Sequence, residues 1–144
     1  MTSLRHVLVV EDSDDDFETV QDAARRAGLA HPLRRALTGD DCLLQLRAGG
    51  PRPGALPALV LMDLNTPCGD GRDALLRMRQ DAALRAVPVV VLSTSGNPRD
   101  VACCYETGAN AFHVKPVQHA EHLRVLADIF AYWLGRAVLP SAKD

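Results

Sequence analysis

The sequence predicts an α/β fold in which a parallel β-sheet carries helices on both faces. Five short apolar segments alternate with five segments whose apolar residues recur at helical spacing. The apolar segments are continuous, as expected for strands buried on both faces of a parallel sheet. Such alternation implies right-handed crossovers, with ligands bound beyond the carboxyl ends of the strands.

The first predicted strand is the run HVLVV at residues 6–10, which ends abruptly in acidic residues. A helix is predicted next, and Gly28 is its expected C-cap. The apolar positions that indicate this helix are Phe17, Val20, Ala24 and Ala27.

A weaker strand is predicted at residues 32–37, and it is followed by a helix at 39–48. The helix carries Cys42, Leu43 and Leu46 on one side. Residues 49–57 contain three prolines and three glycines, so this segment is predicted to be a loop.

The second half of the chain repeats the alternation. Its strands are β-branched or apolar, and its helices show helical spacing of apolar residues or end at a glycine such as Gly108. The predicted elements are a strand at 58–62, a helix from Asp70, a strand at 87–92, a helix at 97–107, a strand at 111–114 and a helix at 117–134.

Length and composition indicate one domain over residues 1–144, with 135–144 as a C-terminal extension. The chain is 47% hydrophobic, enough for one core of ordinary size. Its net charge of −2 gives no general attraction to nucleic acid or to an anionic membrane. The longest early apolar run, at 7–10, is far too short for a signal peptide or a membrane span, which favours a cytoplasmic protein.

Polar residues follow several of the predicted strands. These residues are Glu11 and Asp12, Asp63, Ser93 and Thr94, and Lys115. Carboxylates crowded at the edge of a buried sheet repel one another unless a cation lies between them. Oxygen ligands favour Mg²⁺ or Mn²⁺ over zinc, so the sequence predicts a hard divalent ion at this edge.

With a cation present, the Asp63 carboxylate could act as a nucleophile toward phosphorus and form an aspartyl phosphate. Lys115 and the metal would neutralise charge on the phosphoryl oxygens, and the Ser93 hydroxyl would supply a directional donor.

Four separated motifs resemble a response-regulator receiver domain. They are VLVVED at 7–12, LVLMDLNTPCGDG at 59–71, PVVVLSTS at 88–95 and GANAFHVKP at 108–116. Together they occur in the family's order and at suitable spacings, and the match spans residues 5–134. The resemblance implies a flavodoxin-like three-layer sandwich whose five parallel strands have the order 2-1-3-4-5, flanked by five helices.

The resemblance also implies roles for individual residues. Asp63 would be the phosphoacceptor, and Ser93 and Lys115 the switch pair. Phe112 occupies the position of the family's aromatic switch residue. The implied metal ligands are Asp12, the Asp63 carboxylate, the Asn65 backbone carbonyl and, through water, Glu11. The implied residues that tune phosphate hydrolysis are Asn65 and Ser95.

Two positions depart from the commonest pattern of the family. Ser93 stands where threonine is more frequent but keeps the hydroxyl, and Cys68 interrupts the usual run before Asp70. The resemblance suggests a cis peptide bond at Lys115-Pro116, whereas X-Pro bonds are usually trans.

Three other classes of protein share parts of this pattern. A dehalogenase-type phosphatase needs an acid two residues after its nucleophile, and this chain has Asn65, whose amide cannot shuttle a proton. A flavin-binding carrier needs a phosphate-cradling loop after the first strand, where this chain has carboxylates. A phosphate-insensitive scaffold receiver is disfavoured because all the site residues are retained.

The resemblance implies phosphorelay signalling: a partner histidine kinase supplies the phosphate, and the receiver catalyses only its own phosphotransfer and slow dephosphorylation. The ending FAYWLGRAVLP at 130–140 resembles small stand-alone regulators paired with bacterial phytochromes, which indicates a phytochrome-type kinase and output by protein contact.

The last helix also predicts a homodimer through that helix and the C-terminal extension. A stripe at Leu123, Leu126, Ala127, Phe130 and Leu134 is expected to seal the core. A second stripe, about 120° away, is expected to face solvent and pair with a second copy. Its residues, with an adjacent aromatic, are Val125, Ile129, Tyr132 and Trp133.

Two further groups of polar residues are expected to have ordinary structural roles. Asp14, Asp15 and Asp16 are expected to form a favourable helix entrance, because carboxylates stabilise the positive N-terminal end. His119 and His122 lack a third ligand and are expected at the surface, so no zinc site is predicted.

Overall fold

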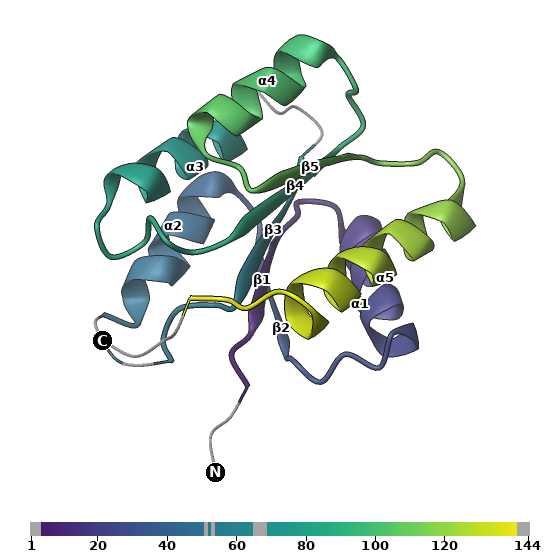
Figure 1. Cartoon of the computed structure of the whole chain (residues 1–144), viewed down its shortest axis with the longest axis horizontal. Coiled ribbons are helices and arrows are strands. Elements are labelled where there is room, and N and C mark those ends of the chain that lie inside the picture. The colour runs from purple at the N-terminus through teal and green to yellow at the C-terminus, as the bar shows by residue number, and fades with distance from the viewer. Residues whose placement is uncertain (1–3, 51, 53, 65–68, 141–144) are drawn as a thin grey trace.

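The computed structural model describes residues 4–50, 52, 54–64 and 69–140, which form a central sheet between two layers of helices (Figure 1). The elements in chain order are β1 (Val7–Val10), α1 (Asp14–Arg26), β2 (Leu33–Ala36), α2 (Gly39–Ala48), β3 (Leu59–Leu64), α3 (Asp70–Gln80), β4 (Val89–Ser93), α4 (Pro98–Thr107), β5 (Ala111–Val114) and α5 (His119–Gly135).

All five strands are parallel, and their order is β2-β1-β3-β4-β5. The fold class and the strand order predicted above are therefore confirmed. The first and last helices, α1 and α5, pack together on one face of the sheet, and α2, α3 and α4 cover the other (Figure 1).

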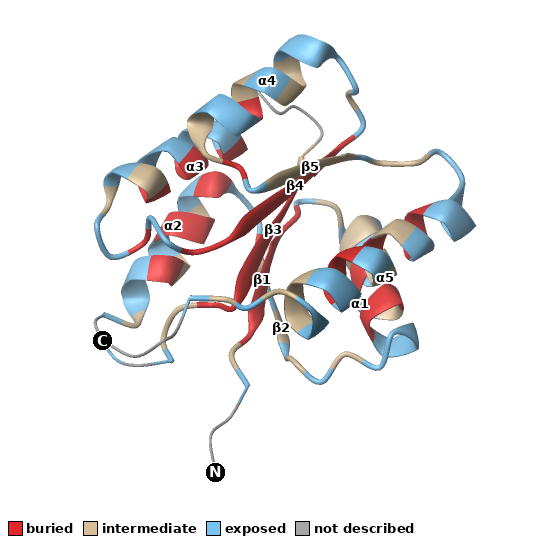
Figure 2. Ribbon diagram, viewed as in Figure 1, coloured by how far each residue is buried: buried red, intermediate tan, exposed pale blue. Residues whose placement is uncertain are grey.

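Alternation of side chains along the strands divides the core in two. Leu8 and Val10 of β1 face the α2–α3–α4 layer, whereas Val7 and Val9 face α1 and α5. Figure 2 shows the buried residues along the central strands and on the sheet-facing sides of the helices. Burying each large aliphatic side chain contributes roughly 1.5–3 kcal/mol.

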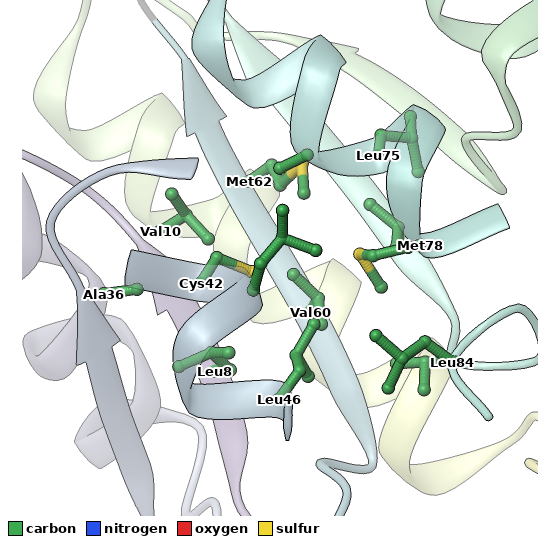
Figure 3. Packing of buried hydrophobic residues seen from close by; sticks show 14 of the residues in the cluster. Leu8, Val10, Ala36, Cys42, Leu46, Val60, Met62, Leu75, Met78 and Leu84 are labelled. Carbon is green, nitrogen blue, oxygen red and sulfur yellow. The ribbon is translucent and has the colours of Figure 1, made fainter. Parts of the chain in front are cut away.

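The α2–α3 side of the core is built from aliphatic, sulfur-containing and small residues (Figure 3). Cys42 and Leu46 of α2 lie over Leu8 and Val60 of the sheet, and Met78 of α3 packs in the same cluster. Burial raises the pKa of the Cys42 thiol to about 12, so Cys42 is a packing residue rather than a reactive thiol.

The predicted end of the third strand is wrong by two residues. That strand was expected to stop at Met62, but β3 continues through Asp63 and Leu64. The cause is its neighbour β4: Asp63 pairs in register with Leu92, and Leu64 with Ser93. Asp63 and Ser93 are thus held within the ladder of the sheet.

Side-chain caps fix the starts of several helices. The Ser13 hydroxyl accepts from the backbone N–H of Asp16 at 3.3 Å, and the Thr38 hydroxyl accepts from that of Asp41 at 3.0 Å. Helix α4 ends at Gly108, whose φ of +121° favours glycine, and a Cβ there would meet the Arg79 side chain.

The expected exposure of Ile129 is wrong, because this residue is only 1% exposed. The buried arc of α5 centres on Leu126 and is wide enough to include Ile129, which lies about 60° from Leu126 around the helix axis. Val125 and Trp133 are half-buried against the same core, whereas Tyr132 is exposed.

The C-terminal segment leaves α5 and passes the amino end of β1 (Figure 1). There the Arg5 guanidinium donates to the carbonyl oxygen of Pro140 at 3.0 Å. Within the part of the chain that the structure describes, no helix is long and apolar enough to cross a membrane.

Candidate functional site

The carboxyl ends of the strands bring the acidic residues and the lysine together. Glu11 and Asp12 follow β1 directly, Asp63 lies near the end of β3, and Lys115 follows β5. A cavity of about 300 Å³ opens beside them, lined by these three acids and, from the α2 and α3 side, by Thr38 and Asp70. The side chains predicted from strand ends therefore share one edge of the sheet.

Asp63 and Lys115 form the shortest ion pair among the described residues. Lys115 Nζ lies 2.5 Å from Asp63 Oδ1, and the Asp63 side chain is fully buried. The backbone N–H of Lys115 donates to the Ser93 carbonyl at 2.7 Å. This bond continues the β4–β5 pairing and fixes the position of the Lys115 backbone. Burial alone lowers the pKa of Lys115, but Asp63, Asp16 and Glu11 outweigh this effect and leave it raised.

Glu11 supplies a second buried carboxyl group beside Asp63. Its Oε2 accepts from the backbone N–H of Ser13 at 3.0 Å, whereas its Oε1 is buried without a hydrogen-bond partner. Burial, and to a smaller extent the neighbouring Asp63 carboxylate, raises the pKa of Glu11 to about 9. The charge of Lys115 offsets this rise only in part, so a further cation beside the unpartnered oxygen would stabilise the carboxylate.

These orphaned oxygens fit a hard divalent cation. Glu11 Oε1 and Asp63 Oδ2 are both buried and unpartnered within the described residues, and Asp12 is exposed at the mouth of the same cavity. Oxygen-only donors of this kind suit Mg²⁺ or Mn²⁺. The predicted ligand Asn65 lies outside the described residues, as does Cys68.

Sequence reasoning missed the part that Asp16 plays in the site. Asp16 Oδ2 lies 3.3 Å from Lys115 Nζ, although the two residues are 99 positions apart. The sequence pattern indicates for Asp16 only a place at the helix entrance. The available signal was its place in the first turn of α1, which begins at the same edge of the sheet as the strand ends.

Ser93 and Phe112 occupy neighbouring strands. The Ser93 side chain is buried and its hydroxyl oxygen accepts from the backbone N–H of Ser95 at 3.1 Å. Phe112 is partly buried against the α2–α3–α4 core, and its backbone N–H donates to Tyr105 Oη of α4 at 3.2 Å. Ser93 is thus hydrogen-bonded to Ser95, in the loop that leads into α4, and Phe112 to Tyr105 of α4 itself.

The structure decides one conformation that the sequence left open and corrects one expected position. No peptide bond is cis among the residues described, so Lys115-Pro116 is trans. His122 is buried, which contradicts its expected surface position, because it lies on the inward face of α5. Burial is the main cause of its lowered pKa. His119 is exposed as expected. Among the described residues no three histidine, cysteine or acidic side chains converge closely enough to enclose a metal by themselves. An ion held by Glu11, Asp12 and Asp63 would therefore need further ligands, as Mg²⁺ does when it binds through one or two carboxylates together with water and phosphate.

The strand order and the acid–lysine cluster at the carboxyl edge of the sheet define a receiver-type α/β domain. The family model for the response regulator receiver domain matches residues 7–127. The chain belongs to this family, which acts in two-component signalling.

Relatives match over nearly the whole chain. Response regulator Rcp1 of Synechocystis sp. is 34% identical over 141 residues, which cover 94% of this chain and 93% of Rcp1. The crystal structure of Mn²⁺-bound Rcp1 has a TM-score of 0.83 at 33% identity, covering 95% of this chain and 99% of that one. The phosphorylated cyanobacterial phytochrome response regulator RcpA has a TM-score of 0.84 at 32% identity, covering 96% and 99%.

Proposed function

We propose that the chain is a response regulator whose Asp63 accepts a phosphoryl group from the phosphohistidine of a partner histidine kinase. The observation that supports this proposal most is the 2.5 Å contact of the buried Asp63 carboxylate with Lys115, beside the buried carboxyl of Glu11. A fully buried carboxylate at a strand end, with a cation-binding edge next to it, is placed to attack phosphorus.

In the transfer step an Asp63 carboxylate oxygen forms a bond to phosphorus. The bond from phosphorus to the kinase imidazole nitrogen breaks, and the nitrogen keeps the electron pair. Lys115 neutralises charge on the phosphoryl oxygens, and the Ser93 hydroxyl donates to one of them. In the later hydrolysis, water attacks phosphorus, inorganic phosphate leaves and the Asp63 carboxylate is restored.

The residues that would hold Mg²⁺ or Mn²⁺ are Glu11, through water, Asp12, Asp63 and the Asn65 carbonyl. When bound, the ion would offset negative charge on the carboxylates and on the incoming phosphoryl group. Support comes from the unpartnered buried oxygens of Glu11 and Asp63, and Rcp1 has been crystallised in an Mn²⁺-bound form. Asn65 and Ser95 are proposed to tune the hydrolysis.

A phytochrome-type kinase is the proposed phosphate donor. RcpA is a cyanobacterial phytochrome response regulator, and AtBRR, 35% identical to this chain with a TM-score of 0.69, is a bacteriophytochrome response regulator. We propose that the output is contact with another protein. We also propose that the chain forms a homodimer through α5 and the C-terminal extension. With Ile129 in the core, the revised dimer surface is Tyr132 together with the half-buried Val125 and Trp133.

Intact mass after incubation with acetyl phosphate and Mg²⁺ tests the phosphoacceptor. The wild type is expected to gain one hydroxylamine-sensitive phosphoryl group, and Asp63→Asn none. Asp12→Asn should need more Mg²⁺ for labelling, whereas Asp40→Asn, an exposed acid on α2, is the matched control. Acyl phosphate at the wild-type level in Asp63→Asn would exclude the assignment.

A separate transfer assay tests the donor. A purified phytochrome-type kinase, labelled with phosphate on its histidine, is expected to transfer to this chain faster than a histidine kinase without a phytochrome sensor. Equal rates from both kinases, with Asp63 still labelled, would reject the phytochrome pairing and leave the phosphoacceptor assignment intact.

A further inference from the structure

We propose that Asp16 is a positioning residue that holds the Lys115 ammonium in the site while Asp63 changes from a carboxylate to an acyl phosphate. The inference rests on the proposed function of Asp63. It gives a role in that reaction to one of the three acids in the first turn of α1.

The geometry places Lys115 between two carboxylates. Its Nζ lies 2.5 Å from Asp63 Oδ1 and 3.3 Å from Asp16 Oδ2. The Lys115 side chain is 9% exposed, that of Asp63 is 0% exposed and that of Asp16 is 38% exposed. The ammonium is therefore held from the inner side by Asp63 and from the solvent side by Asp16.

The backbone of Asp16 is itself fixed to the acidic edge of the sheet. Its N–H donates to the Ser13 hydroxyl at 3.3 Å, and the Ser13 N–H donates to Glu11 Oε2 at 3.0 Å. Two consecutive hydrogen bonds thus connect the first turn of α1 to Glu11, which lies next to Asp63. The same cap that starts the helix places Asp16 beside Lys115.

The neighbouring acids do not share this position. Asp14 Oδ1 is paired with Arg35 at 2.7 Å, on the β2 side of the helix start. Asp15 is exposed. Among the described residues, the side-chain ion pairs of Lys115 are those with Asp63 and Asp16.

Phosphorylation gives this second contact its importance. Forming the acyl phosphate consumes the charge of the Asp63 carboxylate and places negative charge on the phosphoryl oxygens, so the Lys115 ammonium has to move from one partner to the other. The lysine side chain has a flexible four-carbon stem, which allows this movement and also allows the ammonium to turn toward solvent. An anchor that does not react limits that movement. Asp16 keeps the Lys115 ammonium at the mouth of the site, where the ammonium contacts the phosphoryl oxygens instead of solvent.

The test compares three variants in phosphorylation by acetyl phosphate at saturating Mg²⁺. Asp16→Asn is expected to slow the reaction about fivefold, which corresponds to ~1 kcal/mol. Asp15→Asn is the matched control, because it removes the same charge from the adjacent position, and it should stay within about twofold of the wild type. Asp16→Glu restores the carboxylate and should recover most of the rate.

A spectroscopic measurement separates positioning from a general loss of stability. The ¹⁵Nζ resonance of Lys115 in the unphosphorylated protein is expected to shift in Asp16→Asn and to keep its wild-type position in Asp15→Asn. The inference is overturned if Asp16→Asn reacts at the Asp15→Asn rate or faster, or if the Lys115 resonance does not move. The rates are compared only where Asp63 is the labelled residue, and the resonance is read before any phosphorylation, so both outcomes are distinct from failure of the phosphoacceptor assignment.

Discussion

The Ser95 hydroxyl donates a 2.6 Å hydrogen bond to Oδ2 of Asp100 in the first turn of α4. The backbone N–H of the same serine donates to the Ser93 hydroxyl at 3.1 Å. Ser95 therefore connects the buried hydroxyl of Ser93, at the end of β4, to the start of α4. Through these two hydrogen bonds, a movement of the Ser93 hydroxyl would displace Ser95 and with it the start of α4.

A double-mutant cycle measures the strength of that connection. Ser95→Ala, Asp100→Ala and the double variant are expected to give a coupling energy of about 1 kcal/mol in urea unfolding, because a partly buried hydrogen bond to a carboxylate is stronger than a neutral one. The cycle cancels any other contacts of Asp100. Strictly additive effects of the two substitutions would show that the bond is not stabilising.

The switch prediction concerns Ser93 and Phe112. Bound beryllofluoride is expected to draw the Ser93 hydroxyl inward and to shift the amide resonance of Phe112, which donates to Tyr105 Oη of α4. Asp63→Asn is the control and should show neither change. Unaltered Phe112 and α4 resonances at saturating beryllofluoride would contradict a switch through this pair.

The dimer prediction depends on Tyr132, which is 56% exposed on α5, with its ring centroid 5.3 Å from that of Trp133. Light scattering should find a wild-type dimer at tens of micromolar, which requires roughly 7 kcal/mol of association. Tyr132→Glu should give a folded monomer. Leu44→Glu, at an exposed leucine on the other helical layer, should remain dimeric. A monomeric wild type, or a dimeric Tyr132→Glu, contradicts this surface.

A pH prediction follows from His6, which precedes β1 and is 8% exposed. Burial, with the nearby charges of Arg34 and Arg5, lowers the pKa of His6 to about 4. The unfolded chain binds this proton near pH 6.5 and the folded protein resists it, so folding loses stability as the pH falls from about 6.5 to 4.

Replacing His6 by leucine is expected to remove this part of the loss, at most about 3 kcal/mol at pH 4. The measurement is the free energy of unfolding in urea across this pH range. His119→Gln, at an exposed histidine, is the control. A wild-type pH profile in His6→Leu would show that other groups cause the acid destabilisation.

Elements whose signals are local could be predicted from the sequence. The helix at 39–48 and the strand at 111–114 have the bounds expected from their apolar spacing and flanking residues. The same holds for the edge of the sheet at which Asp63 and Lys115 meet, because parallel strands bring their carboxyl ends together. The family resemblance added the strand order, which the apolar pattern leaves open.

Only the tertiary structure decided the features that depend on neighbours distant in sequence. Ile129 and His122 are buried because the sheet and α1 cover a wider arc of α5 than one stripe of the helix indicates. Strand β3 continues to Leu64 because β4 lies beside it. Asp16 pairs with Lys115 because the start of α1 and the end of β5 lie at one edge of the sheet, and a contact across 99 residues has no signature in local spacing.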